Sequence, residues 1–423
     1  MEIIGKGDYE LGAVWVAMKV PDGYITAHAN QARIQTFPLN NPETCLYAKD
    51  IISFAKKIGL YPSTGADEAF SFSDVYDPVN FGGARFCEAR VWSIFSQVLG
   101  KDWSDQYLDY AQGYNLTNRM PLFVKPVKKV SLSQTMELMR SHFENTQLDM
   151  TGAQFDDVGA YTASIYRAHP LTWSSKVNPD GSDAQEAVSY FHERPIATPQ
   201  TGWNFVAQSR KSMPRELAAL MWFGVDDSGT TVRFPVYGSA TAVPKTFGGK
   251  GPQDGVVPPM MEFSLDSAFY VFNLVANWAY SRWDVIYPDV YQAIQAKETQ
   301  YLQEIKQLDQ EAIAVAHKEG MSAAIALVTQ YSIRTGDQLT HDWFKFFGQL
   351  FVKYRDGYVV TKDDQAKSCG CNAKGASYPQ PWFDRIVRDT QDHYLYREDD
   401  GKKNKRVKGQ LKPVDKLQLR ALQ

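Results

Sequence analysis

The chain has 423 residues, of which 44% are hydrophobic, 22% charged and 13% aromatic. This length can bury one large core or two, and the composition is that of a folded globular protein. A formal net charge of −3 gives no general electrostatic reason to bind nucleic acid or an anionic membrane. No apolar run approaches the roughly 20 residues that span a bilayer. Neither nucleic acid nor a membrane is therefore expected as a partner.

The amino-terminal part of the chain combines short strands with helices. Strands are predicted at residues 2–4 and 13–20, and a Pro-Asp-Gly turn then predicts a hairpin with residues 24–29. The second strand lacks polar alternation, which favours a strand covered on both faces. Apolar residues at helical spacing predict helices over residues 44–58 and 84–99.

The middle of the chain contains a helix, a loop region and further strands. Ser131 or Ser133 is the expected N-cap of a helix that runs to about residue 143. Residues 150–195 are rich in Asp, Gly, Ser and Pro, which predicts mainly loop. Apolar and aromatic runs then predict three strands, at residues 202–208, 218–225 and 231–237.

The final third of the sequence is largely helical. Breaks at Pro288, Gly320 and Gly336 separate four predicted helices, at residues 265–284, 288–318, 321–334 and 337–354. Strands and helices therefore occur in blocks. Such blocks favour an α+β fold over a regular βαβ alternation.

Common catalytic and cofactor motifs are absent from the sequence. It has no HExxH, no GxSxG, no phosphate-binding loop and no Gly-rich dinucleotide fingerprint after a strand. The seven histidines are scattered without the spacing of metal ligands. Cys369-Gly370-Cys371 lacks the second Cys pair or nearby His that would complete a zinc site. Neither a metal nor a cofactor is expected.

Polar residues follow the strand at residues 24–29. The segment HANQARI, at residues 28–34, comes directly after this strand. Active-site groups often lie at strand ends on a rigid scaffold. The amide of Asn30 could donate a hydrogen bond to a developing oxyanion. An Asx-type turn capped by Asn30 explains the same residue equally well.

A second polar segment is GGARFCEARVW, at residues 82–92. Its two glycines would open a helix with free N–H groups and room for close approach. Arg85 and Arg90 lie about 140° apart on an α-helix, so only one is expected to face a given site. Either could bind a substrate carboxylate, and a structural ion pair with Glu88 is the alternative. Cys87, within an apolar helix, is not an expected nucleophile.

Several stretches resemble the C69 family of dipeptidases, N-terminal nucleophile hydrolases related to penicillin V acylase and bile salt hydrolase. They occur in the family's order over most of residues 2–355, and their length makes chance a poor explanation. The principal ones are VPDGYITAHANQARI at 20–34, FGGARFCEARVW at 81–92, NRMPLFVKP at 118–126, TPQTGWNFVAQSR at 198–210 and SLDSAFYVFNLVANWAY at 264–280.

The resemblance implies an α+β fold of a particular kind, an αββα sandwich with its amino-terminal part missing. The remainder of that domain would occupy residues 1–262, and a helical carboxy-terminal region would pack on it at residues 263–395. A basic tail at residues 396–423 is expected to be disordered.

The resemblance also implies a cysteine dipeptidase that acts on short peptides, and it leaves open a homo-oligomer. The nucleophile would be a cysteine at the mature amino terminus, with its own α-amine as base and an acyl-enzyme intermediate. At matching positions, Asn30 would stabilise the oxyanion and Arg90 would be part of the catalytic site. Arg85 and Gln31 would bind substrate.

The sequence departs from the family in one decisive respect. Family members begin with Cys-Thr-Thr and then carry an Asn-Glu-Asp stretch, and this sequence has neither at an equivalent place. The resemblance therefore implies a fragment without the nucleophile, inactive as it stands. The alternative is a degenerate, non-catalytic paralogue that acts as a binding or scaffold protein.

Overall fold

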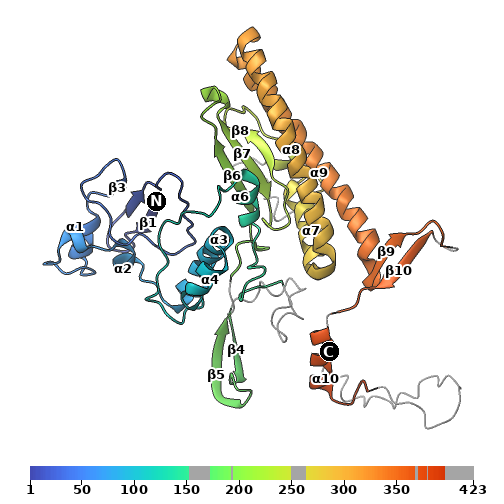
Figure 1. Ribbon diagram of the computed structural model, residues 1–423, viewed down its shortest axis with the longest axis horizontal. Helices are drawn as coiled ribbons and strands as arrows, with labels where there is room; N and C mark the ends of the chain where they lie inside the picture. Colours follow the sequence, from blue (N-terminus) through green and yellow to red (C-terminus); the bar gives the residue numbers. More distant parts are fainter. Residues whose placement is uncertain (152–171, 192–193, 249–262, 367–369, 379, 396–423) are drawn as a thin grey trace. The chain divides into compact units, whose positions relative to one another are not determined.

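The structure is a computed structural model of the 423-residue chain (Figure 1). The chain divides into two compact units, Met1–Ser377 and Tyr378–Gln423. The basic tail expected at residues 396–423 lies outside the described residues. The mixture of helices and small sheets confirms the α+β class. The described residues are 1–151, 172–191, 194–248, 263–366, 370–378 and 380–395.

The first sheet has three antiparallel strands, β1 (Glu2–Gly5), β2 (Ala13–Met18) and β3 (Cys45–Tyr47). Val14 and Val16 of β2 point into a core shared with helices α1 (Ile51–Lys57) and α2 (Phe72–Tyr76). Trp15 lies on the other face and is only partly buried. The strand is thus fully covered on one face only, whereas the sequence predicted that both faces would be covered.

The predicted hairpin of residues 13–20 with 24–29 is wrong. β2 pairs with β1 and β3, whereas Ile25 forms an isolated bridge with Val124. The Pro-Asp-Gly turn does form, since Tyr24 N donates to Pro21 O at 3.0 Å. The chain after it joins a different core from that of β2. Tertiary packing therefore separates two strands that a local turn alone would pair.

The helices of this region are shorter or more divided than predicted. The helix expected at 44–58 begins only at Ile51, because residues 45–47 form β3. The helix expected at 84–99 is a π-helix over Gly83–Glu88 followed by α3 (Ala89–Leu99). Two short helices follow, α4 (Lys101–Gln106) and α5 (Leu108–Ala111).

Ser131, one of the two residues predicted as N-cap, caps helix α6 (Leu132–Leu138). Its side chain accepts from Gln134 N, and the Gln134 side chain accepts from Ser131 N. This capping box satisfies two N–H groups at the helix start. The helix ends five residues before the predicted position of about 143.

The loop predicted at residues 150–195 contains a hairpin. β4 (Thr172–Val177) pairs antiparallel with β5 (Asp183–Phe191) around a tight turn. Most side chains of β4 are exposed, so the composition of the ribbon is polar and resembles that of a loop. Trp173 and Tyr190 stack across the two strands.

The second sheet is an antiparallel meander of β6 (Trp203–Ser209), β7 (Ala219–Val225) and β8 (Phe234–Tyr237), which confirms three predicted strands. One face packs on three helices, which Figure 1 shows in yellow to orange. Trp222 and Phe234 are buried there. The helices are α7 (Ala268–Ser281), α8 (Trp283–Glu319) and α9 (Met321–Tyr354).

Two of the three predicted helix breaks are wrong. Pro288 lies near the start of α8, where its missing N–H removes a single intrahelical bond. Gly336 lies inside α9, and a Cβ there would come within 2.4 Å of Pro244 Cγ. This glycine therefore permits close packing. Gly320, with a φ of 94°, does separate α8 from α9.

A last hairpin of the first unit, β9 (Tyr358–Lys362) with β10 (Cys371–Gly375), follows α9. The second unit contains helix α10 (Gln380–Thr390). None of the helices among the described residues combines the length and apolar character needed to cross a membrane.

Candidate functional site

Asn30 and Arg90 lie 60 residues apart in sequence and are hydrogen bonded in the structure. Arg90 Nη2 donates to Asn30 Oδ1 at 3.1 Å, and Arg90 Nε donates to the carbonyl of Phe86 at 2.7 Å. Asn30 is exposed and has a φ of 53°. Asparagine is among the few residues that adopt this left-handed conformation readily. The two predicted catalytic residues are therefore neighbours at one surface.

Arg90 orients the amide of Asn30. A guanidinium can only donate hydrogen bonds, so the atom facing it must be the amide oxygen. The Nδ2 group then points away from Arg90, and within the described part of the chain it has no hydrogen-bond partner. Asn30 thus presents a free N–H donor at the surface.

A second positive charge, that of Arg194, acts on Arg90. Burial lowers the pKa of Arg90, contact with the Cys87 thiol opposes that shift, and the charge of Arg194 adds to it. Burial raises the pKa of Cys87 despite the neighbouring Arg90. Cys87 is therefore a protonated thiol at neutral pH, which agrees with the expectation that it is not a nucleophile. No sequence pattern singled out Arg194.

Gln31 is buried beneath the start of the π-helix. Its Nε2 donates to the carbonyl and the carboxylate of Asp77, at 2.6 and 2.9 Å, and Ala32 N donates to the same carboxylate. A Cβ on Gly83 would lie 2.3 Å from Gln31 Oε1. Of the two glycines expected to give room for close approach, Gly83 does so, because Gln31 packs directly against it.

Replacement of Gly83 with alanine is expected to lower the free energy of unfolding by about 1–3 kcal/mol, because overpacking displaces the buried amide of Gln31 from Asp77. Urea denaturation measures the effect. Gly82→Ala is the matched control, since its Cβ would come no closer than 3.4 Å to Asn80. Equal stability of both variants would show that the close packing of Gly83 against Gln31 does not contribute to the stability of the protein.

Arg85 belongs to the π-helix, so the separation of about 140° from Arg90, which assumed α-helical geometry, does not apply. Its guanidinium lies 5.7 Å from the centre of the Phe81 ring, an arrangement typical of a cation–π contact. Arg85 is half-buried near the start of the same helical segment that carries Arg90.

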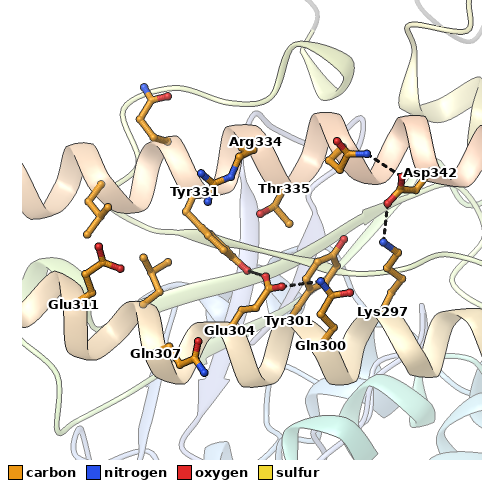
Figure 2. A pocket seen from close by; sticks show the side chains of 14 residues that line it. Lys297, Gln300, Tyr301, Glu304, Gln307, Glu311, Tyr331, Arg334, Thr335 and Asp342 are labelled. Atoms are coloured by element: carbon orange, nitrogen blue, oxygen red, sulfur yellow. Dashed lines mark hydrogen bonds and ion pairs between the residues drawn. The ribbon is translucent and has the colours of Figure 1, made fainter.

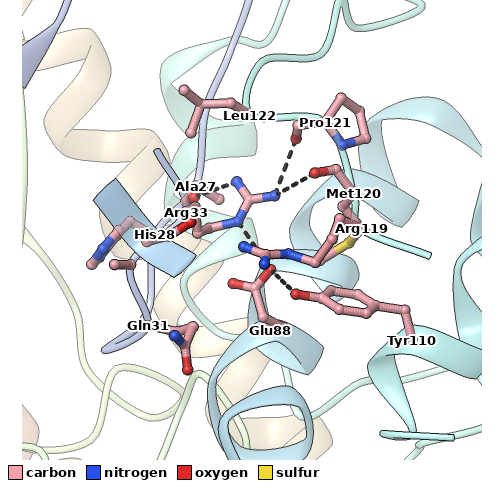
Figure 3. Close-up of polar contacts among 12 residues, drawn as sticks. Ala27, His28, Gln31, Arg33, Glu88, Tyr110, Arg119, Met120, Pro121 and Leu122 are labelled. Carbon is pink, nitrogen blue, oxygen red and sulfur yellow. Dashed lines mark hydrogen bonds and ion pairs between the residues drawn. The ribbon is translucent and has the colours of Figure 1, made fainter. Parts of the chain in front are cut away.

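The alternative for Arg85 and Arg90, an ion pair with Glu88, does not form, because Glu88 pairs with Arg33 (Figure 3). Arg33 Nε lies 3.1 Å from Glu88 Oε2, and the Tyr110 hydroxyl donates to the same oxygen at 3.1 Å. Both charged residues are buried. The remaining guanidinium nitrogens donate to backbone carbonyls, those of Ala27, Met120 and Pro121.

Glu2 fixes the other side of the same segment. Its buried carboxylate accepts from Arg33 N at 2.7 Å and from Ile34 N at 3.1 Å. The HANQARI segment is thus held at Gln31, Arg33 and Ile34, and Asn30 remains exposed at its edge. The sequence did not single out Arg33, because its burial and its partners become visible only in the folded chain.

Among the residues that the structure describes, no group of three or more His, Cys, Asp or Glu side chains could hold a metal ion. Cys369 of the Cys-Gly-Cys stretch lies outside those residues, and Cys371 begins β10.

Comparison with known proteins identifies the family. The profile of peptidase family C69 matches residues 1–296. Similar proteins include a probable dipeptidase of Salmonella dublin (28% identity, covering 33% of this chain and 30% of that protein) and probable dipeptidase A of Streptococcus pyogenes serotype M3 (22%, covering 56% and 42%). Dipeptidase A of Lactobacillus helveticus is 20% identical, covering 84% and 62%. The chain thus matches less than two thirds of the length of each. The extent of the profile match shows that the chain belongs to peptidase family C69.

Proposed function

We propose that this chain forms part of a cysteine dipeptidase, in which Asn30 and Arg90 stabilise the oxyanion of the reacting peptide. The observation that carries the proposal is the Arg90-oriented amide of Asn30, whose Nδ2 group has no hydrogen-bond partner among the described residues. A fixed N–H donor of this kind stabilises charge that develops on a carbonyl oxygen. The names of the similar proteins support a dipeptide as substrate.

The nucleophile in this proposal is an amino-terminal cysteine outside the printed sequence. Its thiolate would attack the peptide carbonyl, with its own α-amine as base, and the acyl-enzyme would be hydrolysed by water. The positive charges of Arg90 and Arg194 suit the anionic intermediate and a substrate carboxylate. Of the two described thiols that titrate, Cys45 and Cys87, neither suits this role, because burial raises the pKa of each.

We also propose that the two three-stranded sheets belong to an αββα sandwich. Each sheet has helices on one face and apolar side chains on the opposite, open face. Ile3 and Leu46 are more than half exposed on the first sheet, as is Trp203 on the second. Apolar faces of this kind require cover. An experimental structure with these faces buried in separate cores would contradict the sandwich.

The 423-residue chain alone is expected to hydrolyse no dipeptide, because neither titrating thiol is activated. Iodoacetamide-sensitive cleavage by the purified chain would contradict this and point to Cys87. The DNA upstream of Met1 provides the companion test. An in-frame sequence encoding Cys-Thr-Thr and then Asn-Glu-Asp supports the dipeptidase, and a stop codon supports the non-catalytic binding protein that the raised thiol pKa values also favour.

In a protein that carries the nucleophile, Asn30→Ala is expected to lower kcat by about 10²-fold or more, the usual cost of losing one oxyanion donor. KM should change little, since the donor acts on charge that forms during the reaction. Steady-state hydrolysis of a dipeptide measures both. Asn372→Ala, on exposed β10, is the matched control. A kcat equal to that of the control would remove Asn30 from the site.

A further inference from the structure

A polar groove of about 580 Å³ lies between α8 and α9 (Figure 2). Its walls come from residues 297–311 of the first helix and 327–342 of the second. None of these residues is assigned a role above. Opposite charges in such a groove are expected to form ion pairs across the two helices, and one such ion pair is present. Lys297 Nζ lies 2.7 Å from Asp342 Oδ2, so these two charges neutralise each other.

A second pair of opposite charges in the groove is not joined. The Glu304 carboxylate accepts from the Tyr331 hydroxyl at 2.6 Å and from Gln300 Nε2 at 2.7 Å, and both donors are neutral. No Lys, Arg or His among the described residues forms an ion pair with Glu304. Arg334 is exposed and, within the same part of the chain, has neither an ion pair nor a hydrogen bond. Glu304 and Arg334 thus face the same groove without an ion pair to any described residue, as does the carboxylate of Glu311 nearer its end.

Tyr301 contributes an unpartnered polar atom. Its side chain is buried, with 4% of the residue exposed, yet it lines the groove. Figure 2 shows its ring between the two helices with the hydroxyl directed into the groove. No described residue hydrogen-bonds this hydroxyl. Because Tyr301 lines the groove, its hydroxyl can hydrogen-bond a polar group that binds there.

We propose that the groove binds a small zwitterion with an α-ammonium group at Glu304 and a carboxylate at Arg334. Arg334 follows Tyr331, the hydrogen-bond partner of Glu304, by three residues, about 4.5 Å of rise along the helix axis. That offset is comparable with the separation of the two charged ends of an amino acid or a dipeptide. The Tyr301 hydroxyl would hydrogen-bond the ligand between them. The ligand class is therefore free amino acids and short peptides with open termini, and their binding requires no hydrolysis.

Isothermal titration of the 423-residue chain tests the proposal with L-leucine, Gly-Leu, N-acetyl-leucine and leucine amide. The two zwitterions are expected to bind, and each capped leucine, which lacks one of the charges, to bind at least about tenfold more weakly than L-leucine. Leucine is not a peptidase substrate, so its binding succeeds or fails independently of the proposed dipeptidase. Stronger binding of Gly-Leu than of leucine would assign the groove to peptides, and the reverse to amino acids.

Three variants locate the binding. Glu304→Gln and Arg334→Gln are each expected to weaken the binding of whichever zwitterion binds more tightly, by about tenfold or more. Lys306→Gln, whose side chain is exposed outside the groove, is expected to leave that affinity unchanged. Thermal unfolding verifies that each variant is folded. The proposal is overturned if no zwitterion binds, or if both groove variants bind as the control does. It is also overturned if sedimentation shows a dimer of the chain that Arg334→Gln dissociates, because a second copy would then occupy the groove.

Discussion

Replacement of Glu88 with glutamine is expected to lower the free energy of unfolding by about 3–5 kcal/mol. The substitution preserves the size of the side chain and removes the negative charge that faces Arg33. Glu88 is 1% exposed and Arg33 is 4% exposed, so water cannot replace the lost partner. The carbonyls around Arg33 bind its N–H groups but carry no full charge.

Urea denaturation measures this effect against two comparisons. Glu68→Gln, at an exposed position, should change the stability by less than about 0.5 kcal/mol. Tyr110→Phe removes one hydrogen bond to Glu88 and should cost about 1 kcal/mol. A double replacement of Arg33 and Glu88 by methionine and leucine should be less harmful than Glu88→Gln alone, because no buried charge remains. A loss below about 1 kcal/mol for Glu88→Gln would contradict the ion pair's role.

The stability of the protein is expected to fall as the pH rises from about 4 to about 8, through Asp226. Burial, and then the charge of Asp227, raise the pKa of Asp226 from 3.8 to about 8, although a hydrogen bond from Asn273 opposes the shift. The folded chain therefore keeps a proton that the unfolded chain releases near pH 4. Within this window the folded state binds more protons, so the free energy of unfolding decreases with pH. The limiting slope is about 1.4 kcal/mol per pH unit.

Asp226→Asn is expected to remove this contribution and to make the protein more stable than wild type at pH 8. Asparagine keeps an oxygen for the Asn273 side chain and tolerates the φ of 64° at this position. Denaturation midpoints at pH 5, 6, 7 and 8 measure the slope of each protein. Asp8→Asn, at an exposed position, should retain the wild-type slope. Parallel slopes for wild type and Asp226→Asn would assign the pH dependence to other groups.

The sequence predicts elements well where one local pattern decides the structure. The meander β6–β8 and the Ser131 cap follow from strand composition and capping chemistry. It fails where distant contacts decide. Pro288 and Gly336 do not interrupt their helices, since one lies near a helix start and the other permits close packing with the Pro244 ring. The β4–β5 ribbon has loop-like composition because it is exposed.

The candidate site shows the same division. Asn30 is selected because it follows a predicted strand, although residues 24–29 form only the isolated bridge of Ile25 with Val124. Arg90 is selected from the family resemblance. Arg33 could not be assigned its partners, because Glu88, Met120 and Pro121 come from segments far away in sequence. A spacing argument for Arg85 and Arg90 also assumed an α-helix where the chain forms a π-helix. Local patterns do not encode such contacts.

The single glycine between α8 and α9 has a consequence for the order of folding. These helices, of 37 and 34 residues, are joined only by Gly320, so contacts near the joint connect residues close in sequence. Each further turn of both helices adds only about seven residues to that separation. The entropy of closing a loop grows slowly with its length. The helical pair can therefore assemble from its joint outward through small steps, whereas the pairing of β2 with β3 must at once bring together residues about thirty positions apart.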